Sequence, residues 1–149
     1  MKPNSIVVFL VLICGLFNSV PALSQELVDV QAQLVDEINA LRKRRLMAPL
    51  EYRVKFQDQT NVWAKHISRD YNHNYKDACT GEVINIVIDI DAIIASFMDS
   101  PRHKDILMDR KVKGICLSVW LKPGGVKAIE DGTEFSLDKY YTVIRTYRN

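Results

Sequence analysis

The chain has 149 residues, of which 48% are hydrophobic and 26% are charged, and its formal net charge is +2 at pH 7. This length and apolar content suit one globular domain with a buried core and leave little room for a second domain. The near balance of charge argues against a nucleic-acid-binding protein. The densest positive run, residues 42–45, closes a helical pattern, where we expect it to be solvated and to complement the helix dipole.

The first 24 residues have the pattern of a secretory signal peptide. Lys2 supplies a positive charge, and an apolar run of roughly twelve residues follows, which is too short to span a bilayer. Ala22-Leu23-Ser24 is a small-x-small cleavage pattern, so the sequence predicts a signal peptide over 1–24 and one domain over 25–149. No later stretch is apolar for long enough to cross a membrane. We therefore expect a secreted protein, periplasmic or extracellular, without stable membrane insertion.

The use of cysteine agrees with export. Removal of the signal peptide removes Cys14 and leaves Cys79 and Cys116. An even pair in an oxidising compartment favours one disulfide, and two separately buried thiols are the alternative. Two cysteines are too few for a closed structural zinc site.

Helical patterns dominate the first half of the chain. Apolar residues recur at spacings of three and four, which predicts an amphipathic helix over residues 26–46. Pro49 disfavours helix at the preceding residue and begins an extended link. A second helical pattern covers residues 54–71. Its buried side would carry Phe56, Trp63, Ile67 and Tyr71.

The middle of the chain combines a loop, an extended segment and a capped helix. Residues 72–81 are polar and predict a loop, and the β-branched residues 82–88 predict a short strand or a buried extended segment. Two short helices follow and meet at Ser100, whose side chain suits a helix cap. Pro101 suits the first helical position, and His103 then lies in the first turn.

Strand patterns dominate the last third. Residues 112–121 alternate and predict a strand with Ile115, Leu117, Val119 and Leu121 on one face. Turn residues at 123–125 and a polar stretch over 127–133 predict a loop, and residues 139–148 predict another strand. Helices followed by strands predict an α+β fold, in which an antiparallel sheet is covered by helices.

The histidines and one glutamate are the candidate site residues. His66 lies within a helix beside basic residues, so we expect it to face solvent. His73 lies in the polar loop, Glu82 follows a glycine, and His103 lies on the capped helix. These types can hold zinc or another divalent metal, although their separations are unlike those of a local metal motif. A nucleophile elbow, a glycine-rich phosphate loop and a dinucleotide fingerprint are missing from the sequence.

Several short motifs occur in a characteristic order. Residues 35–42 (Val-Asp-Glu-Ile-Asn-Ala-Leu-Arg) come first, followed by Trp63-Ala64 and then by Gly81-Glu82-Val83-Ile84. The last is Phe97-Met98-Asp99-Ser100-Pro101-Arg102-His103. Together they resemble the CAP superfamily of cysteine-rich secretory, antigen 5 and pathogenesis-related proteins, also called SCP-like domains, in its bacterial form. The resemblance extends from about Leu34 to Tyr147.

This resemblance implies a single-domain α-β-α sandwich. It also implies a cleft lined by histidines and acidic residues, which in some family members binds zinc or another divalent ion. Carried over by position, the cleft and metal residues here are His73, Glu82 and His103. Val83 stands where the family has asparagine, and Phe97 where it has tryptophan. The second acidic residue of the eukaryotic form would fall near Ser100 and is missing.

The resemblance favours a secreted, non-enzymatic binding module, because most family members have no agreed catalytic activity and this chain lacks the second acid. Its partner would be a lipid or sterol, or a protein, including one from a host. One alternative is a metal-assisted hydrolase of extracellular peptide or polysaccharide, with Glu82 as metal ligand or general base. Another is a structural, envelope-interacting protein with a vestigial cleft. The oligomeric state is not indicated.

Overall fold

The computed structural model describes residues 19–73 and 79–148. Most of the predicted signal peptide lies outside these residues, so it stays a prediction, as does the domain start at residue 25. None of the helices over the described residues combines the length and the apolar character needed to cross a bilayer. The elements in chain order are α2 (Ser19–Arg44), β1 (Glu51–Tyr52), η1 (Val54–Phe56), α3 (Gln57–Ile67), β2 (Gly81–Val87), η2 (Ile90–Ala92), α4 (Ile93–Asp99), α5 (Pro101–Leu107), β3 (Gly114–Glu130) and β4 (Thr133–Tyr147).

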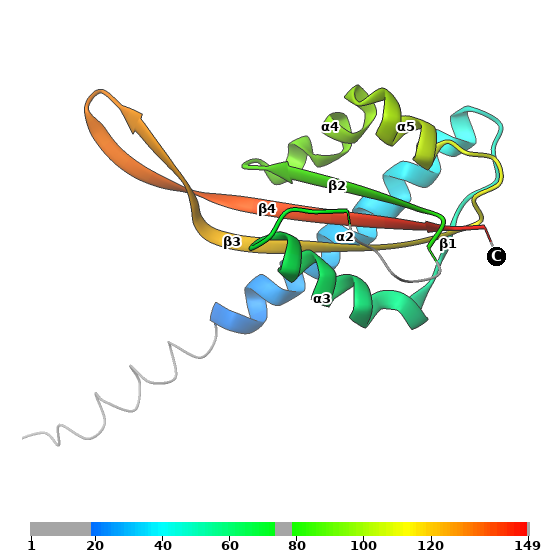
Figure 1. Ribbon diagram of the computed structural model, residues 1–149, viewed down its shortest axis with the longest axis horizontal. Helices are drawn as coiled ribbons and strands as arrows, with labels where there is room; N and C mark the ends of the chain where they lie inside the picture. Colours follow the sequence, from blue (N-terminus) through cyan, green and yellow to red (C-terminus); the bar gives the residue numbers. More distant parts are fainter. Residues whose placement is uncertain (1–18, 74–78, 149) are drawn as a thin grey trace, which may run out of the picture.

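The described strands form one sheet in the order β1-β3-β4-β2 (Figure 1). Strand β4 pairs antiparallel with both β2 and β3, and the two-residue strand β1 pairs parallel with β3. Helix α3 covers one face of the sheet, and α2, α4 and α5 lie on the other face. The predicted α+β sandwich is therefore confirmed, and the short β1 pairing is the one parallel element in the described sheet.

Alternation along the strands divides the core between the two faces. The face toward α2, α4 and α5 carries Val83, Ile115, Leu117, Val119 and Ile144, packed on Leu34, Ile38, Phe97 and Leu107. The face toward α3 carries Ile84, Tyr141 and Val143, packed on Ala64 and Ile67. The face predicted for this strand is thus correct for Ile115, Leu117 and Val119, whereas Leu121 is half-buried and lies outside the core cluster.

The junction at Ser100 forms as predicted. The Ser100 hydroxyl accepts a hydrogen bond from the His103 backbone N–H at 3.4 Å, and Pro101 is the first residue of α5. Phe97, which replaces the family's tryptophan, is fully buried in the larger core cluster. The aromatic exchange therefore keeps its packing role.

The second helix is shorter than predicted. It ends at Ile67, and the Ser68 hydroxyl then donates a hydrogen bond to the backbone oxygen of Lys65 at 2.7 Å. The chain turns away there, so Tyr71 is 55% exposed instead of lying on the buried side. Serine competes for backbone hydrogen bonds in this way and commonly marks a helix end.

The basic run at the end of α2 is only partly solvated. Lys43, Arg44 and Arg45 are exposed as predicted, whereas Arg42 is 1% exposed. Its guanidinium donates to four backbone oxygens, those of Ala48 (2.9 Å), Leu107 (2.7 Å), Asp109 (3.2 Å) and Val112 (3.2 Å). Arg42 therefore ties the end of α2 to the loop between α5 and β3.

The loop predicted over residues 123–133 is instead a long hairpin. Strand β3 continues to Glu130, with a bulge between Lys122 and Val126 that absorbs the turn-forming residues. The actual turn is Asp131-Gly132, whose φ angles of 50° and 78° are both positive. Two positive φ angles in a two-residue loop are typical of a type I′ turn, which Asp-Gly favours.

The predicted disulfide is wrong. Cys79 and Cys116 are buried thiols that are not joined to each other. Cys79 precedes β2 and Cys116 lies in β3, on opposite sides of the intervening β4. Two strand spacings amount to roughly 10 Å, which exceeds the Cα separation that a disulfide can bridge. The Cys116 thiol instead donates a hydrogen bond to Gln57 Oε1 at 3.3 Å.

Candidate functional site

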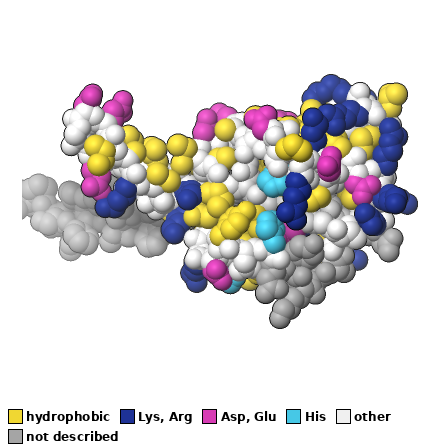
Figure 2. Space-filling model, turned by 45° about the horizontal axis from the view of Figure 1, so that its top comes forward, with side chains coloured by type: hydrophobic (Ala, Val, Ile, Leu, Met, Phe, Trp, Pro, Cys, Tyr) yellow, Lys and Arg dark blue, Asp and Glu magenta, His cyan; other side chains and the backbone are white. Residues whose placement is uncertain are grey.

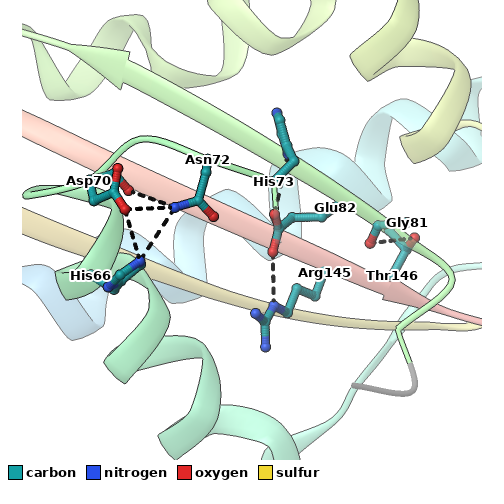
Figure 3. Close-up of polar contacts among 8 residues, drawn as sticks. All are labelled: His66, Asp70, Asn72, His73, Gly81, Glu82, Arg145 and Thr146. Atoms are coloured by element: carbon teal, nitrogen blue, oxygen red, sulfur yellow. Dashed lines mark hydrogen bonds and ion pairs between the residues drawn. The ribbon is translucent and has the colours of Figure 1, made fainter. Parts of the chain in front are cut away.

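A buried ion pair forms the base of the candidate site. Glu82 in β2 lies directly opposite Arg145 in β4, so both side chains project on the α3 face of the sheet. Arg145 Nε donates to Glu82 Oε2 at 3.2 Å, and the two side chains are 3% and 0% exposed (Figure 3). The Arg145 guanidinium also lies 5.6 Å from the centre of the Trp63 ring. Burial of both charges is tolerable because each neutralises the other.

The second oxygen of the same carboxylate contacts His73. The distance from His73 Nδ1 to Glu82 Oε1 is 3.2 Å, and the imidazole is 40% exposed. The edge of the His73 ring also meets Tyr71, with 5.9 Å between ring centres. Glu82 therefore links a buried guanidinium to an imidazole at the surface. This contact joins two of the three predicted cleft residues.

His103, the third predicted site residue, lies in the first turn of α5. Its ring packs edge-on against Phe97, with 5.7 Å between ring centres, and its Nδ1 is buried without a hydrogen-bond partner among the described residues. Burial lowers the pKa of His103, and the nearby charges of His73 and Arg102 lower it further. His103 thus lies close enough to His73 for electrostatic interaction, and this interaction opposes protonation of His103.

The same residues do not fit a metal ion. Among the described residues, no group of three His, Cys, Asp or Glu side chains converges as metal ligands do. Both oxygens of Glu82 already have partners, and the Arg145 guanidinium places a positive charge where a cation would have to bind. The missing second acid matters too, since the Ser100 side chain at that position caps α5. The geometry therefore gives no support to metal binding by His73, Glu82 and His103.

The sequence pattern places Arg145 in a strand and does not identify it as a site residue. It is, however, the one charged residue between Tyr141 and Tyr147. Arginine is almost never fully buried unless it is paired, so a charge on a buried strand face signals a buried partner. His66, by contrast, is at the surface as predicted. It is 3.9 Å from Asp70 and stacks on Trp63, separate from the Glu82 contacts (Figure 3).

No protein-family model and no curated protein sequence matches this chain. Several solved structures are similar in fold, including the following three. An outer surface protein from Borrelia burgdorferi is 14% identical, with a TM-score of 0.56 over 81% of this chain and 94% of its own. An extracellular SCP-domain protein from Bacillus anthracis is 15% identical, with a TM-score of 0.58 over 83% of this chain and 42% of its own. A cysteine-rich secretory protein from Staphylococcus aureus is 16% identical, with a TM-score of 0.50 over 79% and 38%.

These similarities confirm the predicted SCP-like (CAP) fold of the chain. The chain spans less than half the length of the Bacillus and Staphylococcus proteins. At identities of 14% to 16% the similarity concerns the fold, so the role of the cleft must be argued from its own residues.

Proposed function

We propose that this SCP-fold chain is an exported binding protein whose cleft receives the acidic group of an amphiphilic ligand, such as a fatty acid. The observation that carries the proposal is that both carboxylate oxygens of Glu82 are engaged, one by Arg145 and the other by His73. Export is supported by the signal-peptide pattern and by the outer-surface and extracellular descriptions of the similar structures.

The charge balance of the cleft favours an anionic group. Glu82 is the acidic side chain in these contacts, and Arg145 neutralises it. His73, His103 and Arg102 then leave hydrogen-bond donors and a positive field at the cleft, which already opposes protonation of His103. A carboxylate placed between the histidines would relieve this repulsion and accept charge-assisted hydrogen bonds.

An apolar surface beside the cleft favours a ligand with a hydrocarbon part. Trp63, Ile86 and Trp120 are partly buried and pack on the core cluster under α3. Figure 2 shows two histidine side chains at the surface beside a hydrophobic patch and a basic side chain. A flat or extended alkyl chain could cover this patch while its acidic end reaches the histidines, which fits the predicted lipid class.

The geometry supports binding better than catalysis. A metal-assisted hydrolase needs Glu82 as a metal ligand or a general base, and neither oxygen of this carboxylate is free for that role. A purely structural cleft would not require the Nδ1 atom of His103 to be buried without a hydrogen-bond partner among the described residues. Recognition of a ligand therefore accounts for more of the observed contacts than either alternative.

Calorimetric titration with dodecanoate and with the uncharged dodecanol tests the proposal. We expect dodecanoate to bind, dodecanol to bind at least about tenfold more weakly, and His73→Ala and His103→Ala to weaken dodecanoate binding by about tenfold. His66→Ala should have a smaller effect, because this histidine is separate from the Glu82 contacts but stacks on Trp63 of the apolar surface. Arg44→Ala, which removes an exposed side chain of α2, is the control that should change nothing.

Equal affinity for the acid and the alcohol would refute recognition of the acidic group. Equal, small effects of His73→Ala and His66→Ala would instead support the vestigial cleft. A zinc titration whose heat is lost in His103→Ala would support the metal alternative.

A further inference from the structure

The hairpin of β3 and β4 extends far beyond the rest of the sheet (Figure 1). We call residues 122–139 the arm. All arm residues are described and none is buried, whereas residues 114–119 and 141–147 of the same strands all are. A two-stranded hairpin that packs on nothing is at best marginally stable in water. The arm therefore gains stability from any surface that covers it.

One face of the arm is apolar. Val126 lies opposite Leu137 and Ala128 lies opposite Phe135, so all four side chains project to the same side. None of these four belongs to the core clusters of the described residues, and Phe135 is 36% exposed. The other face is mainly polar, with a 2.6 Å ion pair between Lys127 and Glu134. No core cluster within residues 19–73 and 79–148 therefore covers this apolar face.

The two ends of the arm carry opposite charge. The tip, residues 127–134, holds Glu130, Asp131 and Glu134 against a single lysine, a net charge of −2. At the root, Lys139 lies over the ring of Tyr141 (5.6 Å), and Lys65 of α3 lies over that of Trp120 (5.0 Å).

Lys122 completes the root, and its ammonium group donates to the Ser68 backbone oxygen at 3.3 Å. Figure 2 shows acidic side chains at the far end of the arm and basic ones where it joins the body.

This arrangement is complementary to itself. We propose that the arm pairs with the arm of a second copy of this chain across a two-fold axis, apolar face to apolar face. The two arms would run in opposite directions, so each acidic tip meets the lysines at the root of its partner. A two-fold interface needs one patch that complements itself, and the arm provides both apolar and charge complementarity in one surface.

The size of the surface sets the expected strength. Residues 133–139 span roughly 23 Å, which is room for four apolar side chains from each copy. The area that four such side chains can bury is less than the roughly 800 Å² per partner of a standard stable interface. The dimer should therefore be weak, with a dissociation constant in the micromolar range. Because attraction between the acidic tips and the lysines at the roots contributes to the dimer, and salt screens this attraction, the dimer should weaken as salt is added.

Sedimentation velocity on the exported full-length product tests the dimer. We expect a concentration-dependent monomer–dimer equilibrium that Leu137→Asp shifts to monomer. Ile129→Asp is the matched control, because it introduces the same charge into the same arm on the opposite face, at a side chain that is 75% exposed. Thermal unfolding of both variants should match that of the unmodified protein, since neither site contributes to the core.

A charge exchange tests the antiparallel arrangement. Glu130→Lys and Lys139→Glu should each dissociate the dimer alone, because the first brings two lysines together at each end of the interface and the second brings two glutamates together there. Mixed together, the two variants should form a heterodimer, because a lysine then meets a glutamate at each end. The proposal is overturned by a chain that stays monomeric, by equal effects of Leu137→Asp and Ile129→Asp, or by variants that do not combine when mixed.

Discussion

A few charged side chains inside the molecule fix the positions of the residues at the candidate site. Glu82 is fully buried, and its two oxygens contact Arg145 and His73 from opposite sides. Removal of one partner from a buried pair typically costs 3–5 kcal/mol, about as much as a marginal domain can spare. The same carboxylate therefore secures β2 against β4 and sets the orientation of a surface histidine.

His103 should make the stability of the protein depend on pH. Burial, then the charges of His73 and Arg102, lowers the pKa of His103 from its ordinary value of 6.5. The unfolded chain then binds a proton more readily than the folded chain, so the free energy of unfolding falls as the pH drops below this value. Urea unfolding at about pH 7.5 and about pH 5 should show a smaller difference for His103→Gln, which cannot titrate, than for the unmodified protein.

The exposed His66 supplies the control for this effect. His66→Gln should keep the full difference in stability between the two pH values. A slope for His103→Gln equal to that of the unmodified protein would mean that other groups cause the pH dependence.

At the scale of elements, hydrophobic periodicity predicts α2 and the core of β3, although α2 begins at Ser19 instead of residue 26 and ends at Arg44. The capping residues Ser100 and Pro101 predict the start of α5. The prediction failed at the hairpin, because Pro123, Gly124 and Gly125 carry stronger turn signals than the Asp131-Gly132 pair that actually turns the chain. Local patterns also cannot indicate buried charges, since their partners are distant in sequence. Arg145 is 63 residues from Glu82, and Arg42 is 65 residues from Leu107.

Arg42 is the element-scale contact most open to measurement. Its guanidinium satisfies four carbonyl oxygens across two segments, and hydrogen bonds to a charged group contribute about 1.5–3 kcal/mol each. We expect Arg42→Ala to lower the free energy of unfolding by about 3 kcal/mol or more in urea titrations. Arg44→Ala removes an exposed arginine half a turn further along α2 and should cost no more than about 0.5 kcal/mol. Similar losses from both substitutions would show that the buried contacts contribute little.

At the scale of the whole molecule, helices close both faces of the sheet without a covalent cross-link. The two cysteines lie on either side of β4, and both contribute to a small cluster with Tyr147 and Phe56. The disulfide was predicted from the compartment alone, and compartment says nothing about distance. The contact between His73 and Glu82, in contrast, joins two residues that motif order places in one cleft, and the role of these residues stays a prediction.

The cysteines should therefore behave as protected thiols. Burial raises the pKa of the Cys116 thiol, which keeps it protonated and slow to react in the native protein. We expect intact-mass analysis of the exported protein, denatured without reductant and treated with iodoacetamide, to show adducts at both Cys79 and Cys116. The native protein should take up label at Cys116 far more slowly. A denatured protein that accepts label only after reduction would restore the disulfide.

The position of β4 also affects the order in which the protein can form. This strand is central in the sheet, yet it is the last strand in the chain, so β2 has no partner and β3 has only two residues of β1 until it has been made. During synthesis the ribosome releases the helices and the strands β1, β2 and β3 before the segment that unites them. The pairing of β2 with β4 joins residues more than fifty positions apart, and such pairing is slow. The described sheet should therefore stay incomplete until β4 has been made, and an incompletely folded chain is compatible with passage through a membrane channel.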